Sequence, residues 1–148
     1  MRTINLSDII ISENFLKSNP NDKKIKKVIK YIKKHGKIDK PIVLNNGVLV
    51  DNYVRYLASK INGLQEVPYV ELQQMNYIIG KFDNCDKEYI WKNDMGVNIK
   101  VGDNVVVCVK HGGSKNKKVY VNVVDIFSSD SLDLYNKHKS IVKIKENY

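Results

Sequence analysis

The sequence predicts an α+β protein built from two small modules, residues 1–74 and 75–148. The first half alternates strand and helix patterns, whereas the second half holds short strand patterns and no proline. The 148 residues suffice for one ordinary domain or two very small ones. Hydrophobic residues make up 43% of the chain, so it can bury enough apolar surface to offset the entropy lost on folding. A disordered tail is therefore excluded.

The N-terminal third predicts a strand followed by a helix. Residues 3–12 have the pattern of a strand and its continuation, because apolar and polar residues alternate from Ile4 to Leu6. Asn21 is a helix-capping residue, and apolar residues then recur at the spacing of an amphipathic helix. Gly36 ends this helix as a left-handed cap would. The helix also carries seven lysines: Lys23, Lys24, Lys26, Lys27, Lys30, Lys33 and Lys34.

A hairpin, a second helix and a strand complete the first half. Asn46-Gly47 lies between two apolar runs and favours a tight type I′ turn. Asp51 and Asn52 follow the hairpin and can cap the second helix, which Gly63 ends. The three elements are expected at residues 41–50, 53–62 and 67–70.

The second half predicts a small, mostly antiparallel β-barrel or sandwich. Strand patterns recur between turn signals, with a turn at residues 111–114 and a helical turn expected within residues 129–139. The expected strands cover residues 77–82, 88–91, 104–110, 118–127 and 141–144. Residues 99–107 resemble the Val-Gly-Asp turn that leads into a strand of Src-homology-3-like and KOW-type barrels, which favours the barrel.

Charge is unevenly distributed along the chain. The 25 basic and 16 acidic residues give a net charge of +9, and the first half carries most of the excess. Arg2 and Arg55 are the two arginines, so the other 23 basic residues are lysines. A lysine-rich surface attracts polyanions without sequence preference. A solvated face that reflects the base composition of a genome explains the lysines equally well.

Composition excludes several classes of protein. The chain contains no run of 18 apolar residues, so we expect no transmembrane helix and no membrane partner. The N-terminus lacks the apolar region of a signal peptide. Cys85 and Cys108 are too few for a disulfide scaffold, and neither the cysteines nor the three histidines have metal-ligand spacing. We therefore expect a cytoplasmic protein without a bound metal.

The junction between the hairpin and the second helix predicts an anion site. A strand that runs directly into a helix exposes backbone N–H groups at the positive end of the helix. Arg55 falls in the first turn of that helix and can offer a planar fork to a phosphate. An ion pair with a carboxylate such as Asp51 is the alternative role for this arginine. Asp39 and Asp22 are further carboxylates that could lie nearby.

The first half resembles the ParB/sulfiredoxin superfamily. The matching segments are Pro41-Ile42-Val43, the run from Leu49 to Ala58, and Gly63 followed by Val67-Pro68. In sulfiredoxin-like members the signature turn and its arginine hold nucleotide phosphates, helped by a lysine early in the preceding helix. The resemblance therefore implies phosphate contacts for Arg55 and for Lys24, which matches that lysine.

This sequence departs from the family pattern at three positions of the signature. Tyr53 stands at the sulfiredoxin cysteine, so peroxiredoxin repair is not expected. Val54 stands at the family histidine, and Asn52 at the second glycine of the turn. The arginine-rich box and the helix-turn-helix domain of the ParB CTPases are also missing. The resemblance thus implies an anion-binding shape with little catalytic machinery.

Aromatic residues of the second half have two interpretations. Tyr89 and Trp91 share one face of a strand by the two-residue period. With neighbouring lysines they could stack on the bases of a single-stranded nucleic acid. They could also fill the core of a small barrel, and this second interpretation is favoured.

The leading functional expectation is non-catalytic binding of nucleic acid, DNA or RNA, or of a nucleotide. One alternative is a phosphohydrolase or nuclease, with Asp51 assisting water and with a nucleotide and Mg²⁺ as cofactor. The other is an interaction protein of a phage or mobile element that docks on an acidic protein surface and inhibits a host nucleic-acid machine. The residues expected to hold the phosphate are Lys24, Lys27, Asn52, Tyr53, Val54 and Arg55.

Overall fold

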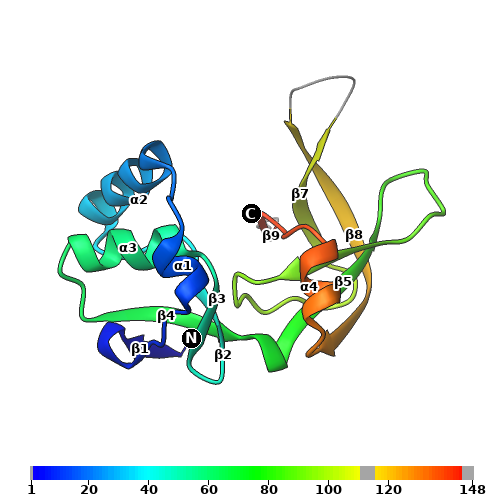
Figure 1. The fold of residues 1–148 in the computed structure, drawn as a ribbon. Coiled ribbons are helices and arrows are strands. Elements are labelled where there is room, and N and C mark those ends of the chain that lie inside the picture. The colour runs from blue at the N-terminus through cyan, green and yellow to red at the C-terminus, as the bar shows by residue number, and fades with distance from the viewer. Residues whose placement is uncertain (1, 111–115, 145–148) are drawn as a thin grey trace. The chain divides into compact units, whose positions relative to one another are not determined.

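The computed structural model describes residues 2–110 and 116–144 (Figure 1). The chain divides into two compact units, Met1–Leu72 and Gln73–Tyr148. The first contains a four-stranded sheet and the second a five-stranded sheet, so the α+β class is confirmed. The turn predicted at residues 111–114 lies outside the described residues.

The sheet of the first unit combines antiparallel and parallel pairing in the order β1-β4-β2-β3. β2 and β3 form the predicted hairpin, and Asn46 and Gly47 in its turn have φ angles of 51° and 83°. β4 pairs parallel with β2 and antiparallel with β1. The strands are β1 (Thr3–Asn5), β2 (Ile42–Asn45), β3 (Val48–Asp51) and β4 (Glu66–Glu71).

The two predicted helices of this unit are present as α2 (Asp22–His35) and α3 (Tyr53–Ile61). The Asn21 side chain caps α2 by accepting hydrogen bonds from the backbone N–H groups of Lys23 and Lys24. Gly36 ends α2 with a left-handed φ of 74°.

A buried apolar cluster joins these helices to the sheet. From α2 it takes Val28 and Ile32, which lie four residues apart and therefore on one face of the helix. From the sheet it takes Ile42 and Leu44 of β2, which are both fully buried. Packing of α2 against β2 and α3 thus leaves the lysine-rich side of the helix to solvent.

The N-terminal segment differs from its prediction. The strand expected over residues 3–12 ends at Asn5, where a 3-10 turn begins (η1, Leu6–Asp8). A short helix follows as α1 (Glu13–Lys17), with the Ser12 hydroxyl accepting a hydrogen bond from the Phe15 amide. The Phe15 ring packs on Tyr53 of α3, at 5.0 Å between centroids. The Ser12 cap and the contact with Tyr53 therefore stabilise a short helix after the strand that the sequence predicted.

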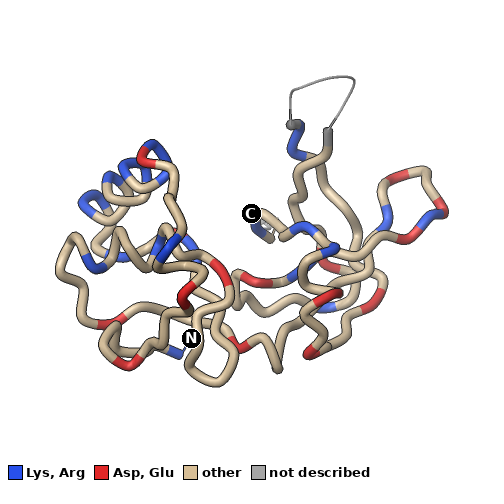
Figure 2. Tube along the Cα trace, in the orientation of Figure 1, with Lys and Arg blue, Asp and Glu red and all other residues tan. Residues whose placement is uncertain are grey.

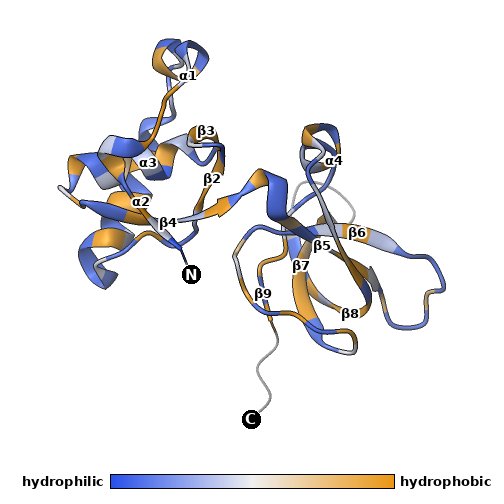
Figure 3. Cartoon of the chain, turned by 90° about the horizontal axis from the view of Figure 1, so that it is seen from below, coloured by the Kyte–Doolittle hydropathy of each residue, from blue (hydrophilic) through white to orange (hydrophobic). Residues whose placement is uncertain are grey.

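The second unit has one antiparallel sheet with the strand order β6-β5-β8-β7-β9. Hydrophobic residues occupy most of β7 and the middle of β8 (Figure 3). A 3-10 turn, η2 (Leu72–Gln74), directly precedes β5. Helix α4 (Leu132–Lys137) confirms the helical turn expected within residues 129–139. The strands are β5 (Met75–Lys81), β6 (Tyr89–Asn93), β7 (Asn104–Lys110), β8 (Asn116–Ser129) and β9 (Lys143–Ile144).

The closed barrel expected for the second half stays a prediction. Strand pairing among the described residues leaves the sheet open, with β6 and β9 at its edges. The segment before β9 nevertheless reaches β6, where the Lys92 amide donates to the Lys139 carbonyl at 2.8 Å and the Ile141 amide to the Lys92 carbonyl at 3.0 Å. An isolated parallel bridge between Lys92 and Ser140 accompanies these bonds.

Trp91 belongs to the core of the second unit. Only 6% of it is exposed, and it packs with buried valines of β7 and β8. A Cβ atom on Gly80 would lie 3.2 Å from the Trp91 ring and 3.1 Å from Val121, so this glycine leaves room for the indole. The interpretation of Trp91 as a core residue is therefore confirmed. Tyr89, next but one along the strand, is 37% exposed.

A group of polar side chains is also buried in the second unit. Asp94 is fully buried and its carboxylate accepts a 2.6 Å hydrogen bond from the Ser140 hydroxyl. The Lys92 ammonium lies 3.7 Å from the centroid of the Tyr135 ring, which is also buried. These contacts attach α4 and the segment before β9 to the sheet.

Tyr77→Phe is expected to stabilise the protein. The Tyr77 hydroxyl is buried and, among the described residues, has no hydrogen-bond partner. Burial and the nearby Asp94 carboxylate raise the pKa of Tyr77 above its ordinary value of 10.0. Removal of the hydroxyl should raise the free energy of unfolding by about 1 kcal/mol.

Chemical denaturation at neutral and alkaline pH measures this effect. Because the pKa of Tyr77 is raised in the folded state, the unfolded state releases this proton first, so the protein loses stability as pH rises above 10.0 and Tyr77→Phe should lack that loss. The control is Tyr89→Phe, at an exposed hydroxyl, which should leave the free energy of unfolding nearly unchanged. A destabilised Tyr77→Phe variant would show that the hydroxyl has a favourable partner.

None of the helices within residues 2–110 and 116–144 combines the length and the apolar character that crossing a bilayer requires.

Candidate functional site

All of the residues predicted to hold a phosphate line one cavity of the first unit. Its volume is about 640 Å³, and we call it the α2–α3 cavity. Four parts of the chain form it: one face of α2, the segment from α1 to Pro20, Asp39 between α2 and β2, and the residues around the start of α3. The predicted residues among its lining are Lys24, Lys27, Asp51, Asn52, Tyr53, Val54 and Arg55.

The wall from α2 follows from helical spacing. Lys24, Lys27 and Tyr31 lie three and four residues apart and therefore project from one side of the helix. Both lysines are exposed, so their ammonium groups can reach a ligand from solvent. Figure 2 shows basic residues at several positions along α2. The lysine-rich sequence thus contributes two of its cations to the cavity.

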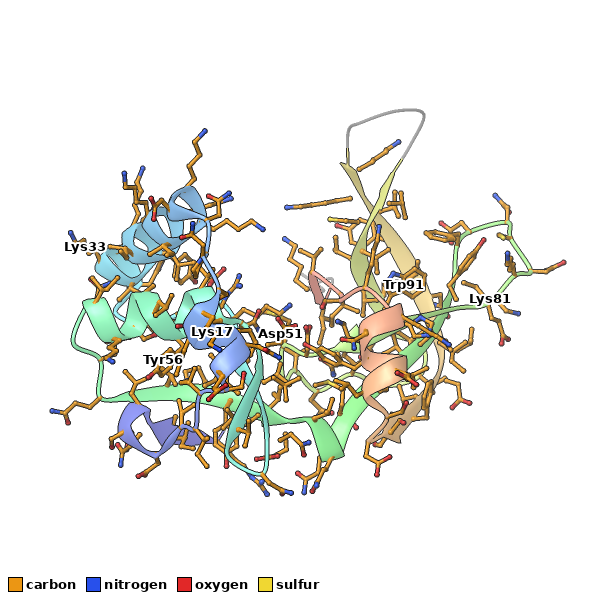
Figure 4. All side chains as sticks on the ribbon, in the orientation of Figure 1. Lys17, Lys33, Asp51, Tyr56, Lys81 and Trp91 are labelled. Atoms are coloured by element: carbon orange, nitrogen blue, oxygen red, sulfur yellow. The ribbon has the colours of Figure 1, made fainter. Side chains whose placement is uncertain are left out.

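The start of α3 is shaped by Asn52, which adopts a left-handed conformation with φ 70° and ψ 39°. Its side-chain amide donates to the Pro41 carbonyl at 2.7 Å, and its backbone N–H donates to the Asp51 carboxylate at 2.7 Å. Asparagine thereby adopts the backbone geometry that the family pattern supplies with glycine. Asp51 is the last residue of β3 (labelled in Figure 4) and contacts the Asn52 backbone.

The predicted capping of α3 by the Asn52 side chain requires a correction. The N-cap residue is Asn52, and in the described structure its side chain accepts no hydrogen bond from a backbone N–H of the first turn. The Asn52 carbonyl accepts from the amides of Arg55 and Tyr56 at 3.0 and 3.2 Å, as in a regular helix. Helix geometry provides no carbonyl for the amides of Tyr53 and Val54, which lie at the cavity. The left-handed backbone of Asn52 directs its side chain to Pro41 instead of to these amides.

Arg55 forms an ion pair with Asp39. The Arg55 Nε atom lies 2.9 Å from Asp39 Oδ1, and Nη2 lies 3.0 Å from Oδ2. The third contact joins Arg55 Nη1 to Asn52 Oδ1 at 3.4 Å. The expected anion-binding arginine thus already holds an anion from its own chain. Asp22, the other carboxylate named from the sequence, lies at the first turn of α2 and outside the cavity lining.

An aromatic and apolar wall completes the cavity. The Phe15 and Tyr53 rings are 5.0 Å apart, and Tyr53 stacks in turn on Tyr56 at 6.0 Å. Sequence analysis missed Phe15, Pro20 and Tyr31 as lining residues. Serine at the α1 cap and glutamate in its first turn were the available signals for that helix. The contact between α1 and α3 had no sequence signal.

Charges of both signs meet in the α2–α3 cavity. Lys24, Lys27 and Arg55 supply three cations, and Asp39 and Asp51 supply two carboxylates. Because Asp39 pairs with Arg55, Lys24 and Lys27 at the α2 wall are the remaining cations of this lining. The cavity can therefore attract an anion at its rim, whereas its arginine must first exchange partners.

Other candidate residues show no arrangement of this kind. In the described ranges there is no cluster of three or more His, Cys, Asp or Glu side chains that could hold a metal ion. The His35 ring packs against Tyr31 at 4.2 Å, near the end of α2. In the second unit the Lys87 ammonium lies 5.2 Å from the Tyr89 ring centroid. Tyr89 is one of the two aromatic residues considered as a stacking surface, and this lysine lies beside it.

Comparisons with known proteins give distant structural likenesses. No protein-family model and no curated protein sequence matches the chain. A ParB-N domain, described as the C2221 form of a Pnob8-like protein, is 21% identical with a TM-score of 0.42. A free serine kinase in complex with AMP is 16% identical with a TM-score of 0.40. The matches cover 47% and 56% of this chain but only 28% and 39% of those proteins.

Proposed function

We propose that the α2–α3 cavity binds a phosphate-bearing ligand, a nucleotide or a nucleic acid, without catalysing a reaction. The observation that carries this proposal is the convergence of Lys24, Lys27 and Arg55 with the start of α3 on one cavity. Lysine and arginine are the side chains that proteins use most for phosphate groups. Because the two lysines and Arg55 lie far apart in the sequence, folding brings them together at this cavity.

The start of α3 supports binding of an anion. This helix has nine residues, its Asn52 N-cap makes no side-chain cap hydrogen bond, and Tyr53 and Val54 of its first turn line the cavity. The backbone amides of a first turn and the positive end of the helix favour a phosphate oxygen. Lys24 and Lys27 face the same volume from α2 and add two further donors. A phosphate in this position would thus have donors from two elements.

The apolar wall suits the remainder of a nucleotide. Phe15, Tyr53 and Tyr31 present rings to the cavity, and a volume of about 640 Å³ lies in the usual range for small-molecule sites. Nucleobases stack favourably on aromatic side chains. A ligand with an anionic end and a flat apolar end would therefore use both parts of the lining.

The geometry of Asp51 favours binding over catalysis. Its Oδ1 atom accepts a 2.7 Å hydrogen bond from the adjacent Asn52 amide, in a local turn that shapes the start of α3. A general base needs a carboxylate oriented toward the water or hydroxyl that it activates. The hydrogen bond to Asn52 gives the Asp51 carboxylate a structural role at the start of α3.

Replacement of the two cavity lysines tests the proposal. Lys24→Ala/Lys27→Ala removes two donors from the α2 wall and should weaken binding of a fluorescent oligothymidylate and of ATP by about tenfold or more. The matched control is Lys23→Ala/Lys33→Ala, which removes the same charge from the same helix outside the cavity lining. Figure 4 shows Lys33 of α2 well apart from Asp51, which ends β3.

Fluorescence anisotropy at about 50 mM and about 200 mM salt measures both pairs of variants. The control pair should weaken binding by about threefold at most, since it alters only long-range attraction. Equal losses for both pairs would assign binding to the whole lysine face and contradict a formed site. Absence of binding by the wild-type protein at low salt would refute the proposed function.

A further inference from the structure

Arg55 binds the Asp39 carboxylate through two hydrogen bonds, the geometry that arginine also uses to bind phosphate. Two parallel N–H···O bonds of 2.9 and 3.0 Å join the guanidinium to both carboxylate oxygens. The side chains are 23% and 35% exposed, so a ligand can approach them from solvent. The best-matched donor pair of the α2–α3 cavity is therefore occupied by the chain itself.

Asp39 is held in this position by its neighbours. It lies between α2 and β2, and the buried residues Ile38 and Pro41 anchor the segment on either side. The Pro41 carbonyl also accepts the 2.7 Å hydrogen bond from the Asn52 side chain. Asn52 Oδ1 in turn contacts Arg55 Nη1. One connected group of contacts thus holds the Asp39 carboxylate next to the Arg55 guanidinium.

We propose that Asp39 acts as a resident competitor for Arg55 and sets the charge that a ligand must carry to bind. This inference rests on the proposed function of the cavity. A phosphodiester carries one negative charge, as Asp39 does, so its exchange for the carboxylate gains no charge at Arg55. A terminal phosphate carries a charge of about −1.5 to −2 at pH 7 and offers three acceptor oxygens.

The two kinds of phosphate should therefore bind unequally. A terminal phosphate gains charge at Arg55 and can also accept from Lys24 and Lys27, which line the same cavity. Either ligand leaves the released Asp39 carboxylate nearby and is repelled by it, but only the terminal phosphate brings additional charge and a third acceptor oxygen that offset this repulsion. The site selects a terminal phosphate, from a nucleotide or from the end of a nucleic acid, over the interior of a polynucleotide strand.

A short oligothymidylate with a 3′ fluorophore, prepared with a 5′-hydroxyl or a 5′-phosphate, tests this selection. The wild-type protein should bind the 5′-phosphate form about fivefold tighter, the ratio that a partly exposed ion pair can produce. Asp39→Asn and Asp39→Ala should bind the 5′-hydroxyl form about fivefold tighter than the wild type does. The preference for the 5′-phosphate should fall in both variants.

The control variant is Asp8→Asn, which gains the same charge at an exposed residue of η1 outside the cavity lining. It should tighten both oligonucleotide forms slightly and equally. Thermal unfolding confirms that each variant is folded. The wild-type ratio needs no variant, so equal wild-type affinity for the two forms overturns the proposal even where an Asp39 variant does not fold.

The outcomes separate this inference from the proposed function. If Arg55→Ala weakens binding but the Asp39 variants keep the wild-type affinities and preference, the cavity binds phosphate and Asp39 does not compete. If Asp8→Asn reproduces the Asp39 variants, net charge alone explains the effect and the competitor role is overturned. If the wild-type protein binds neither oligonucleotide nor ATP at low salt, the proposed function fails and this inference with it.

Discussion

Arg55→Ala is expected to weaken binding of ATP or a 5′-phosphorylated oligonucleotide by roughly ten- to hundredfold. The substitution removes the planar fork and also leaves the Asp39 carboxylate unpaired at the cavity. The remaining carboxylate should repel the ligand, so the loss exceeds that of one contact. Isothermal titration or anisotropy at low salt measures it.

Lys33→Ala is the control for this prediction, because it removes one positive charge from α2 outside the cavity lining. Its affinity should stay within about threefold of the wild type. Arg55→Lys retains the charge without the fork and should lie between Arg55→Ala and the wild type. Equal losses for Arg55→Ala and Lys33→Ala would mean that diffuse attraction, and not a formed site, holds the ligand.

Arg55→Ala should change stability much less than binding. The ion pair with Asp39 is partly exposed, so its removal should cost about 1 kcal/mol or less of the free energy of unfolding. Thermal unfolding of the variant therefore distinguishes a damaged site from a damaged fold.

Ile42→Ala is expected to lower the free energy of unfolding of the first unit by about 2–5 kcal/mol. Ile42 is fully buried on β2 and packs in the cluster that joins α2 and α3 to the sheet. Truncation to alanine removes three carbons and leaves a cavity that the surrounding side chains fill only in part. Chemical denaturation followed by far-UV circular dichroism measures the loss.

The matched control is Ile61→Ala, the same change in the same unit. Ile61 ends α3 and is 65% exposed, and alanine has the higher helix propensity. Its free energy of unfolding should change by no more than about 0.5 kcal/mol. Similar losses for both variants would contradict the assignment of Ile42 to the core.

The elements with strong local signals could be predicted from the sequence. Helix α2 begins after the Asn21 cap, buries Val28 and Ile32 along one face, and ends at Gly36. The β2–β3 hairpin turns at Asn46-Gly47 because these two residues tolerate positive φ angles. In each case the decisive residues lie within one turn of the element, where sequence patterns are informative.

The elements that depend on distant contacts could not be predicted. Helix α1 is five residues long, too short to be stable alone, and its Phe15 packs on Tyr53. Lysines usually lie at the surface, but Lys92 lies buried beside Tyr135. Both depend on residues more than thirty-five positions away.

For the candidate site, the sequence by itself determined the residue types and the two helices that carry them. The lysines of α2 and Arg55 at the start of α3 follow from local pattern and from the resemblance to a known family. The tertiary structure alone decided that these residues face one cavity and that Arg55 pairs with Asp39, sixteen positions earlier in the chain. An ion pair depends on distances in space, and those are set by the packing of α2, α3 and β2, which no local pattern contains.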